Sequence, residues 1–170
     1  MGTPVSASST VVSATFTRPA DTTAYSVGDL VANSTTAASV VPMAFTPGAD
    51  ISRGFSVRRA RVSASNTSTT NASFRVHLYQ TDPSASTGIA NGDNGAWSTK
   101  VAGYMGSLDV TIDKAFTDAA KGVGVPLIGG EVTGTPAAGA LTVYALLEAR
   151  AAYTPTSAQT FTVELEVFQG

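Results

Sequence analysis

The residue types that most often carry out catalysis near neutral pH are scarce in this chain. General acid–base chemistry usually needs a histidine or paired carboxylates in a shared pocket, and His77 is the only histidine of the 170 residues. There is no cysteine, which excludes thiol nucleophiles, zinc–thiolate sites, iron–sulfur clusters and disulfides. His77 shares the polar face of an expected strand with Arg75, which favours a solvated or a structural histidine. The sequence therefore predicts neither an enzyme nor a bound cofactor.

One segment, residues 91–95 (NGDNG), has the oxygen-rich and glycine-punctuated composition of a calcium loop. It lacks the spaced carboxylates and the closing glutamate that calcium ligation requires. A transition metal would depend mostly on carboxylates, because the chain has one histidine and no cysteine, and no carboxylates cluster at ligand spacing. We expect a plain turn here and no metal site.

Basic charge gathers in two neighbouring expected strands, and acidic charge gathers near the C-terminus. The basic side chains are Arg53, Arg58, Arg59, Arg61 and Arg75, and the acidic ones are Glu148, Glu164 and Glu166. One interpretation is cross-strand pairing on a wet sheet face, which stabilises by roughly a few tenths of a kcal/mol per pair. The other is a protein-docking surface, because arginine is enriched in interfaces.

Trp97 is the only tryptophan and stands in a segment rich in glycine and serine. It either plugs the end of the core or anchors an interface. The candidate partner-binding residues are therefore Trp97 and four of the arginines, Arg53, Arg58, Arg59 and Arg61.

The charge of the chain argues against nucleic acid as a partner, and the length of its apolar segments argues against a membrane. The net charge is −2 and no block of lysine and arginine is present to neutralise a phosphate backbone, so nucleic acid is not expected. No segment approaches the roughly 20 apolar residues of a membrane span. The first ten residues lack the basic and apolar regions of a secretory signal, so we expect a protein made and used without signal-directed export.

The composition predicts one folded domain at residues 11–170. Hydrophobic residues make up 43% of the chain and charged residues 13%, which is too apolar for a disordered polypeptide. Residues 1–10 are small and polar and are expected to form a flexible arm. This arm is either a frayed end or a segment that becomes ordered on a partner.

Alternating apolar and polar residues predict strands along most of the chain. The clearest is Ser73–Tyr79, where Phe74, Val76 and Leu78 share one face. Residues 160–168 and 141–147 repeat the pattern. Weaker strands are expected at residues 12–17, 29–33, 39–45, 100–105 and 123–128, and Pro42 makes the third of these an edge strand or a break.

Two local features complete the expected fold. The apolar register of residues 55–64 shifts by one near Arg58 and Arg59, which predicts a β-bulge. Residues 113–122 are expected to form one short connecting helix, with Asp113 as the N-cap and Gly122 as the C-terminal glycine. The prediction is an all-β fold, an antiparallel, jelly-roll-like β-sandwich of about eight strands.

Several segments resemble proteins encoded among the virion structural genes of tailed bacteriophages. They are residues 16–33 (FTRPADTTAYSVGDLVAN), 59–62 (RARV), 74–79 (FRVHLY) and 161–167 (FTVELEV), and together they span most of the chain. The resemblance implies a capsid decoration or cement protein, a β-sandwich on the outside of the head that clamps neighbouring capsid subunits. It implies the major capsid protein and further copies of the chain, as a dimer or trimer, as partners. The place implied is the capsid surface of the virion, after synthesis in the host cytoplasm.

Two alternatives remain open at this point. Residues 25–31 (YSVGDLV) resemble the Y-x-x-G-D-x-V stretch of small chitin-binding modules, although only Tyr25 supplies an aromatic side chain there. A simpler use of the same residues is local, with a turn at Gly28 and Asp29 and with Tyr25 packed on the core. The other alternative is a tail or fibre adhesin domain.

Overall fold

The computed structural model describes residues 8–47, 53–84, 91–97, 102–126, 130–135 and 142–169. These residues form ten strands and two single-turn 3₁₀ helices, at Ala37–Ser39 and Thr67–Thr69. The strands are β1 (Ser8–Thr17), β2 (Leu30–Val31), β3 (Met43–Phe45), β4 (Phe55–Ala64), β5 (Ser73–Tyr79), β6 (Tyr104–Ala115), β7 (Ala120–Gly124), β8 (Val132–Gly134), β9 (Val143–Ala149) and β10 (Thr160–Gln169).

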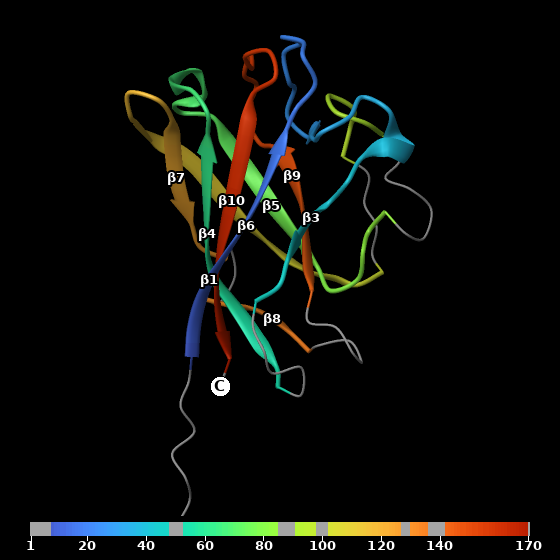
Figure 1. Cartoon of the computed structure of the whole chain (residues 1–170), viewed down its shortest axis with the longest axis vertical. Coiled ribbons are helices and arrows are strands. Elements are labelled where there is room, and N and C mark those ends of the chain that lie inside the picture. Colours follow the sequence, from blue (N-terminus) through green and yellow to red (C-terminus); the bar gives the residue numbers. More distant parts are fainter. Residues whose placement is uncertain are drawn as a thin grey trace, which may run out of the picture.

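All strand pairs are antiparallel, and hydrogen bonds connect the strands in the order β1-β10-β4-β7-β6-β5-β9-β2. The short strands β3 and β8 pair with β9 and β4 respectively. In Figure 1, β7, β4, β10 and β1 run side by side, and β6, β5 and β9 cross behind them. The sheet is therefore curled, and its two halves face one another.

The core fills the space between these two halves. Along β10, residues from Phe161 to Val167 are buried at every second position, and β4 and β9 supply buried residues such as Val62 and Leu147. The rings of Phe74 and Phe161 meet edge to face across this core, with their centroids 5.4 Å apart. The apolar residues that alternate in the sequence thus face the core, and the polar residues between them face solvent.

The expected all-β, antiparallel architecture is confirmed. The structure has ten strands where about eight were expected, and the hydrogen-bonded path joins them into one curled sheet, so a sandwich of two sheets stays a prediction. Pro42 lies directly before β3, which pairs only with β9 among the described strands. β1 begins at Ser8, so the last three residues assigned to an arm are strand residues, and residues 1–7 lie outside the described part of the chain.

The predicted bulge in β4 is confirmed. Arg59 is opposite Glu166 and Val57 is opposite Val167, which leaves Arg58 as the extra residue on β4. Both Arg58 and Arg59 are consequently exposed, while Val57 and Ala60 on either side are buried. An extra residue of this kind lets two consecutive side chains point to the same side of a sheet.

The helix expected at residues 113–122 is wrong. β6 continues to Ala115 and β7 begins at Ala120, so these residues form a β-hairpin whose turn is closed by a bond from the Phe116 N–H to the Ala119 carbonyl. Burial explains the difference, because alternate residues of β6 up to Ile112 are fully buried. The pairing of β6 with β5 and β7 outweighs the weak local preference of a capped helix.

Candidate docking surface

The outer face of the β1-β10-β4-β7 half of the sheet carries charged side chains from neighbouring strands. Arg59 is opposite Glu166, and Arg61 is opposite Glu164. Arg59 Nε lies 3.5 Å from Glu166 Oε2, and Lys121 Nζ lies 2.6 Å from Glu164 Oε2. This half of the sheet therefore presents alternating charges to solvent. Cross-strand pairing of the arginines is what the first interpretation of the sequence expected.

Arg58 extends this face toward the end of the sheet where β8 lies. Its guanidinium carbon lies 3.8 Å from the centre of the Phe168 ring, and its Nε is hydrogen-bonded to the Glu131 carboxylate. A hollow of about 650 Å³ adjoins these residues and is lined by Gly54, Phe55, Ser56, Arg58, Gln80, Glu131, Thr133, Gly134, Thr135, Phe168 and Gln169. We call Arg58, Arg59, Arg61 and Phe168 the arginine face.

The five predicted site residues are not all brought together. Arg58, Arg59 and Arg61 share the arginine face on β4, and Arg53 is an exposed residue just before that strand. Trp97 instead belongs to the other half of the molecule, because its backbone N–H donates to the Gly28 carbonyl and its ring stacks on that of His77 with centroids 3.7 Å apart. The packing interpretation of Trp97 fits this position, and contact of any of the five with a partner stays a prediction.

His77 is not a solvated residue, so that half of the expectation is wrong and the structural alternative fits. Its side chain is 3% exposed, its Nε2 lies 2.7 Å from Glu148 Oε2, and its Nδ1 lies 3.3 Å from the Tyr104 hydroxyl. Burial lowers the pKa of His77 to about 4, although the neighbouring Glu148 carboxylate acts in the opposite direction. The imidazole is consequently neutral at physiological pH. The signal for its burial lies in Trp97, whose ring covers an otherwise polar strand face.

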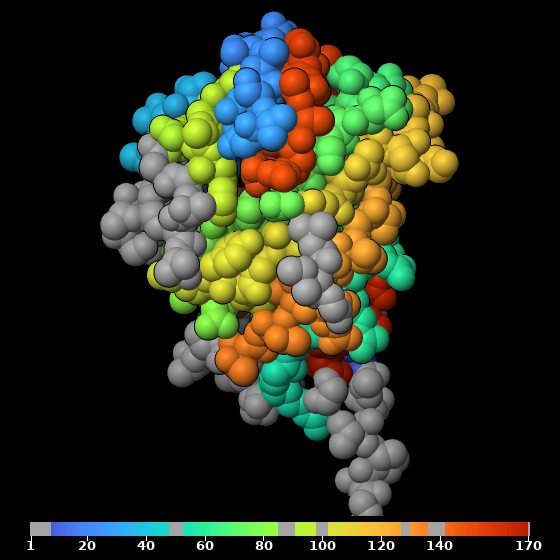
Figure 2. Space-filling model, turned by 180° about the vertical axis from the view of Figure 1, so that it is seen from behind, coloured from blue at the N-terminus to red at the C-terminus, as the bar shows by residue number. Residues whose placement is uncertain are grey.

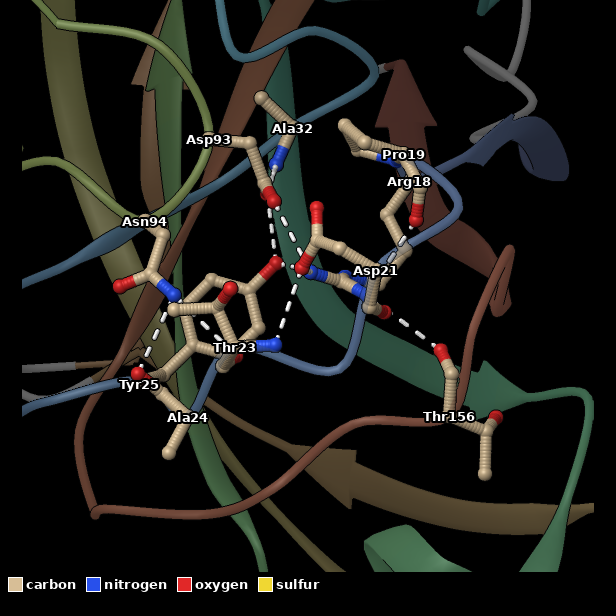
Figure 3. Close-up of polar contacts among 10 residues, drawn as sticks. All are labelled: Arg18, Pro19, Asp21, Thr23, Ala24, Tyr25, Ala32, Asp93, Asn94 and Thr156. Atoms are coloured by element: carbon tan, nitrogen blue, oxygen red, sulfur yellow. Dashed lines mark hydrogen bonds and ion pairs between the residues drawn. The ribbon is translucent and has the colours of Figure 1, made fainter.

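A second buried cluster, centred on Arg18, was not predicted from the sequence (Figure 3). Arg18 Nη2 lies 3.1 Å from Asp93 and 3.0 Å from Asp21, and Arg18 Nε donates to the Tyr25 hydroxyl at 2.8 Å. That hydroxyl donates in turn to Asp93 Oδ1 at 2.5 Å, which also accepts the Ala32 N–H at 2.8 Å. Burial raises the pKa of Asp93, while its hydrogen bonds and Arg18 lower it.

This Arg18 cluster connects loops that are distant in sequence. Arg18 Nη1 donates to the carbonyls of Asp21 and Thr156, so the β1–β2 loop is tied to the β9–β10 loop. Figure 2 shows these two segments, blue and orange-red, side by side at one end of the molecule. Residues 91–95 form the expected turn, and the Asp93 carboxylate is engaged by Arg18 and Tyr25.

Tyr25 is positioned for packing and not for binding a sugar. It is 1% exposed, and its ring stacks on that of Tyr153 with centroids 4.9 Å apart. Gly28 has a φ of +94° in the turn that follows, a conformation that glycine adopts without strain. The local interpretation of residues 25–31 is confirmed, because the one aromatic ring that a chitin-binding stretch would offer faces the core.

Within the described residues, no group of three or more His, Cys, Asp or Glu side chains could hold a metal ion. No helix in the same part of the chain is long and apolar enough to span a membrane.

Comparisons with known proteins give only distant similarities. Neither a protein-family model nor a curated protein matches the sequence. The solved structures that can be aligned over nearly the whole chain include three of viral particles. A chain of the cyanophage Pam1 capsid asymmetric unit aligns at 10% identity and a TM-score of 0.33, covering 99% of this chain and 89% of that one. A chain of cocksfoot mottle virus aligns at 8% identity and a TM-score of 0.28, covering 96% of this chain and 95% of that one. A chain of Desmodium yellow mottle tymovirus aligns at 14% identity and a TM-score of 0.25, covering 99% of this chain and 85% of that one. TM-scores this low assign neither a fold family nor a role to the chain.

Proposed function

We propose that this chain is a virion structural protein that decorates and stabilises the outside of a bacteriophage capsid. The observation that carries the proposal is the division of its charged groups. The buried ones form two separate pairs inside the fold, Arg18 with Asp93 and His77 with Glu148, whereas the arginines of β4 face solvent. The charged groups that remain at the surface are therefore available to bind a partner. The sequence resemblance supplies the partner, the major capsid protein, and the pattern of expected strands supplies the jelly-roll-like form of the domain.

The arginine face suits a protein partner. The side chains of Arg58 and Glu131 are 48% and 37% exposed, so their ion pair lies in water and contributes little to stability. A carboxylate of a capsid subunit could therefore exchange with Glu131 at little cost. Phe168 beneath Arg58 adds an aromatic ring, a residue type that is enriched in interfaces.

Stabilisation of the shell would then follow from mass action. A ligand that binds the assembled shell and not its separated subunits shifts the equilibrium toward assembly. At a concentration about a hundred times the Kd this contributes about 2.7 kcal/mol per site. A clamp that spans two subunits does this without turnover.

The test is binding of the purified protein to phage heads that lack it. We expect co-sedimentation at a fixed ratio, a raised melting temperature of the heads, and affinity about tenfold weaker for Arg58→Ala, because an interface hot spot contributes more than 1 kcal/mol. Lys114→Ala is the matched control, since it removes an exposed cation outside the arginine face. Failure to sediment with the heads would refute the proposal, and a few copies per virion with binding to host cells would favour an adhesin instead.

A further inference from the structure

β1 lies at the end of the sheet, with only one of its two edges hydrogen-bonded to a described strand. Its ten residues pair with β10 from Ser8 opposite Gln169 to Thr17 opposite Thr160. The segment (SSTVVSATFT) has no charged residue, no proline and no bulge. Natural proteins protect an exposed edge with one of these devices or by covering it, and β1 has none of the three devices.

The two halves of this edge differ in what lies beside them. The second half, from Ala14 to Thr17, lines a hollow of about 460 Å³ whose other wall is residues 41–44, at and before β3. The first half, Ser8 to Ser13, has no described strand beside it. Val11 is 50% exposed there.

The pairing with β10 determines which backbone groups point outward. The Arg18 N–H donates to the Gln159 carbonyl at 3.0 Å, and these two residues continue the β1–β10 register. Hydrogen-bonded and non-hydrogen-bonded pairs alternate in an antiparallel ladder, so the even-numbered residues of β1 bond to β10. Ser9, Val11 and Ser13 therefore direct their N–H and C=O groups to the uncovered edge.

We infer that this edge pairs with the same edge of a second copy of the chain, in antiparallel register, with Val11 on the twofold axis. Val11 then lies opposite Val11 of the second copy, and Ser9 lies opposite Ser13. In this register every outward-pointing residue of the uncovered half meets another, and each pair exchanges both of its hydrogen bonds. A shift by one residue would place the bonding groups of one copy opposite the non-bonding groups of the other.

Side chains and charges are compatible with this arrangement. Directly opposite residues of an antiparallel pair point to the same side, so the exposed Val11 side chains cover one another. The nearest charged groups are the Glu166 side chains next to Val11. Three strand spacings separate the two copies of Glu166, about 14 Å, which exceeds the Debye length of about 8 Å at physiological ionic strength.

The interface is small, so the dimer is weak in dilute solution. Five paired residues bury far less than the roughly 1,600 Å² of a stable complex. Neighbouring copies on one particle are held at high effective concentration, and a weak contact suffices there. The use of the dimer as a clamp rests on the proposed function, whereas the pairing itself does not.

The experiment uses single-cysteine variants, because the chain has no cysteine of its own. Val11→Cys places two thiols on the axis, where the Cα atoms of a hydrogen-bonded pair are about 5.5 Å apart, within the range of a disulfide. In a glutathione redox buffer we expect this variant to cross-link at least about tenfold faster than Val123→Cys, since Val123 has matched exposure, 53%, on β7. Ser13→Cys controls the register, because its two Cα atoms would lie about 14 Å apart and cannot be bridged.

A proline variant tests the same contact without cross-linking. The Val11 N–H points away from β10, so Val11→Pro should keep the thermal stability of the monomer and abolish the dimer seen by sedimentation equilibrium at high concentration. Equal cross-linking of all three cysteine variants, or none by Val11→Cys, would overturn the inference, as would an unchanged dimer in Val11→Pro. These measurements contain no phage heads, so they can fail while head binding succeeds, and the reverse.

Discussion

At the scale of residues, the ionisable side chains fall into a buried group and an exposed group, and sequence position does not predict which group a residue belongs to. Arg18 and Asp93 are separated by 75 positions, yet their side chains are fully buried together. Removing one partner of such a pair strongly destabilises the folded protein, because the other partner remains charged or unpaired in the interior. The Arg18 cluster is thus a structural device that fixes three loops at one end of the sheet.

Replacing Arg18 tests this role. Arg18→Met should lower the free energy of unfolding by about 3 kcal/mol, because Asp93 and the Tyr25 hydroxyl lose their buried cation. Urea denaturation measures the loss. Asp21→Asn is the control, since Asp21 contacts the same guanidinium from a side chain that is 36% exposed and should cost less than about 1 kcal/mol. Equal losses in the two variants would contradict the assignment.

The stability of the fold should depend on pH through His77. Its folded pKa of about 4 lies below the unfolded value of 6.5, so the unfolded chain binds the proton more readily between these values. The contribution of the neutral imidazole is complete above pH 6.5 and is lost as the pH falls toward 4, by about 3 kcal/mol at most.

The comparison is with His77→Gln, which keeps a hydrogen bond to Glu148 but does not titrate. The difference in unfolding free energy between the two proteins, followed from pH 7.5 to 4.5, should decrease steadily. A difference that stayed constant with pH would show that the pKa of His77 is the same in the folded and the unfolded chain, and a difference that increased would show that the fold favours the protonated imidazole.

At the scale of elements, the β6–β7 hairpin depends on close contact between backbones. A Cβ placed on Gly122 would lie 2.0 Å from the Thr111 carbonyl oxygen, which the hairpin cannot accommodate without moving a strand. Gly122→Ala should therefore destabilise the protein by about 3 kcal/mol. Gly54→Ala is a matched control with its nearest contact at 3.6 Å, and should change the stability by less than about 0.5 kcal/mol. Thermal unfolding of both variants would decide, and a tolerated Gly122→Ala would count against the hairpin.

The hairpin also shows how far sequence reasoning reaches. The bulge at Arg58 could be predicted because the apolar register shifts within a few residues, a local signal. The hairpin was missed because Asp113 and Gly122 satisfy the local rules for a helix, whereas the pairing of β6 with β5 that outweighs them comes from residues distant in sequence. The Arg18 cluster left no local signal either, since Asp93 sits in a segment that the sequence predicts to be a plain turn. Among the predicted site residues, the three arginines lie together on β4 because they are close in sequence, whereas the fold places Trp97 in the other half of the molecule.

At the scale of the whole molecule, the curled sheet buries one face and leaves the other to solvent, so the outer surface of β4 and β10 is a regular array of charges. If this surface holds the protein on a capsid, salt should weaken the attachment, because exposed pairs are screened at high ionic strength. We expect the Kd for phage heads to rise by about tenfold between about 0.05 and 0.5 M NaCl. Arg58→Ala should show a smaller dependence on salt, and Lys114→Ala should behave as the unaltered protein does. Sedimentation with heads at several salt concentrations measures both effects. A Kd that did not change with salt would place the contact on an uncharged part of the surface, away from the arginine face.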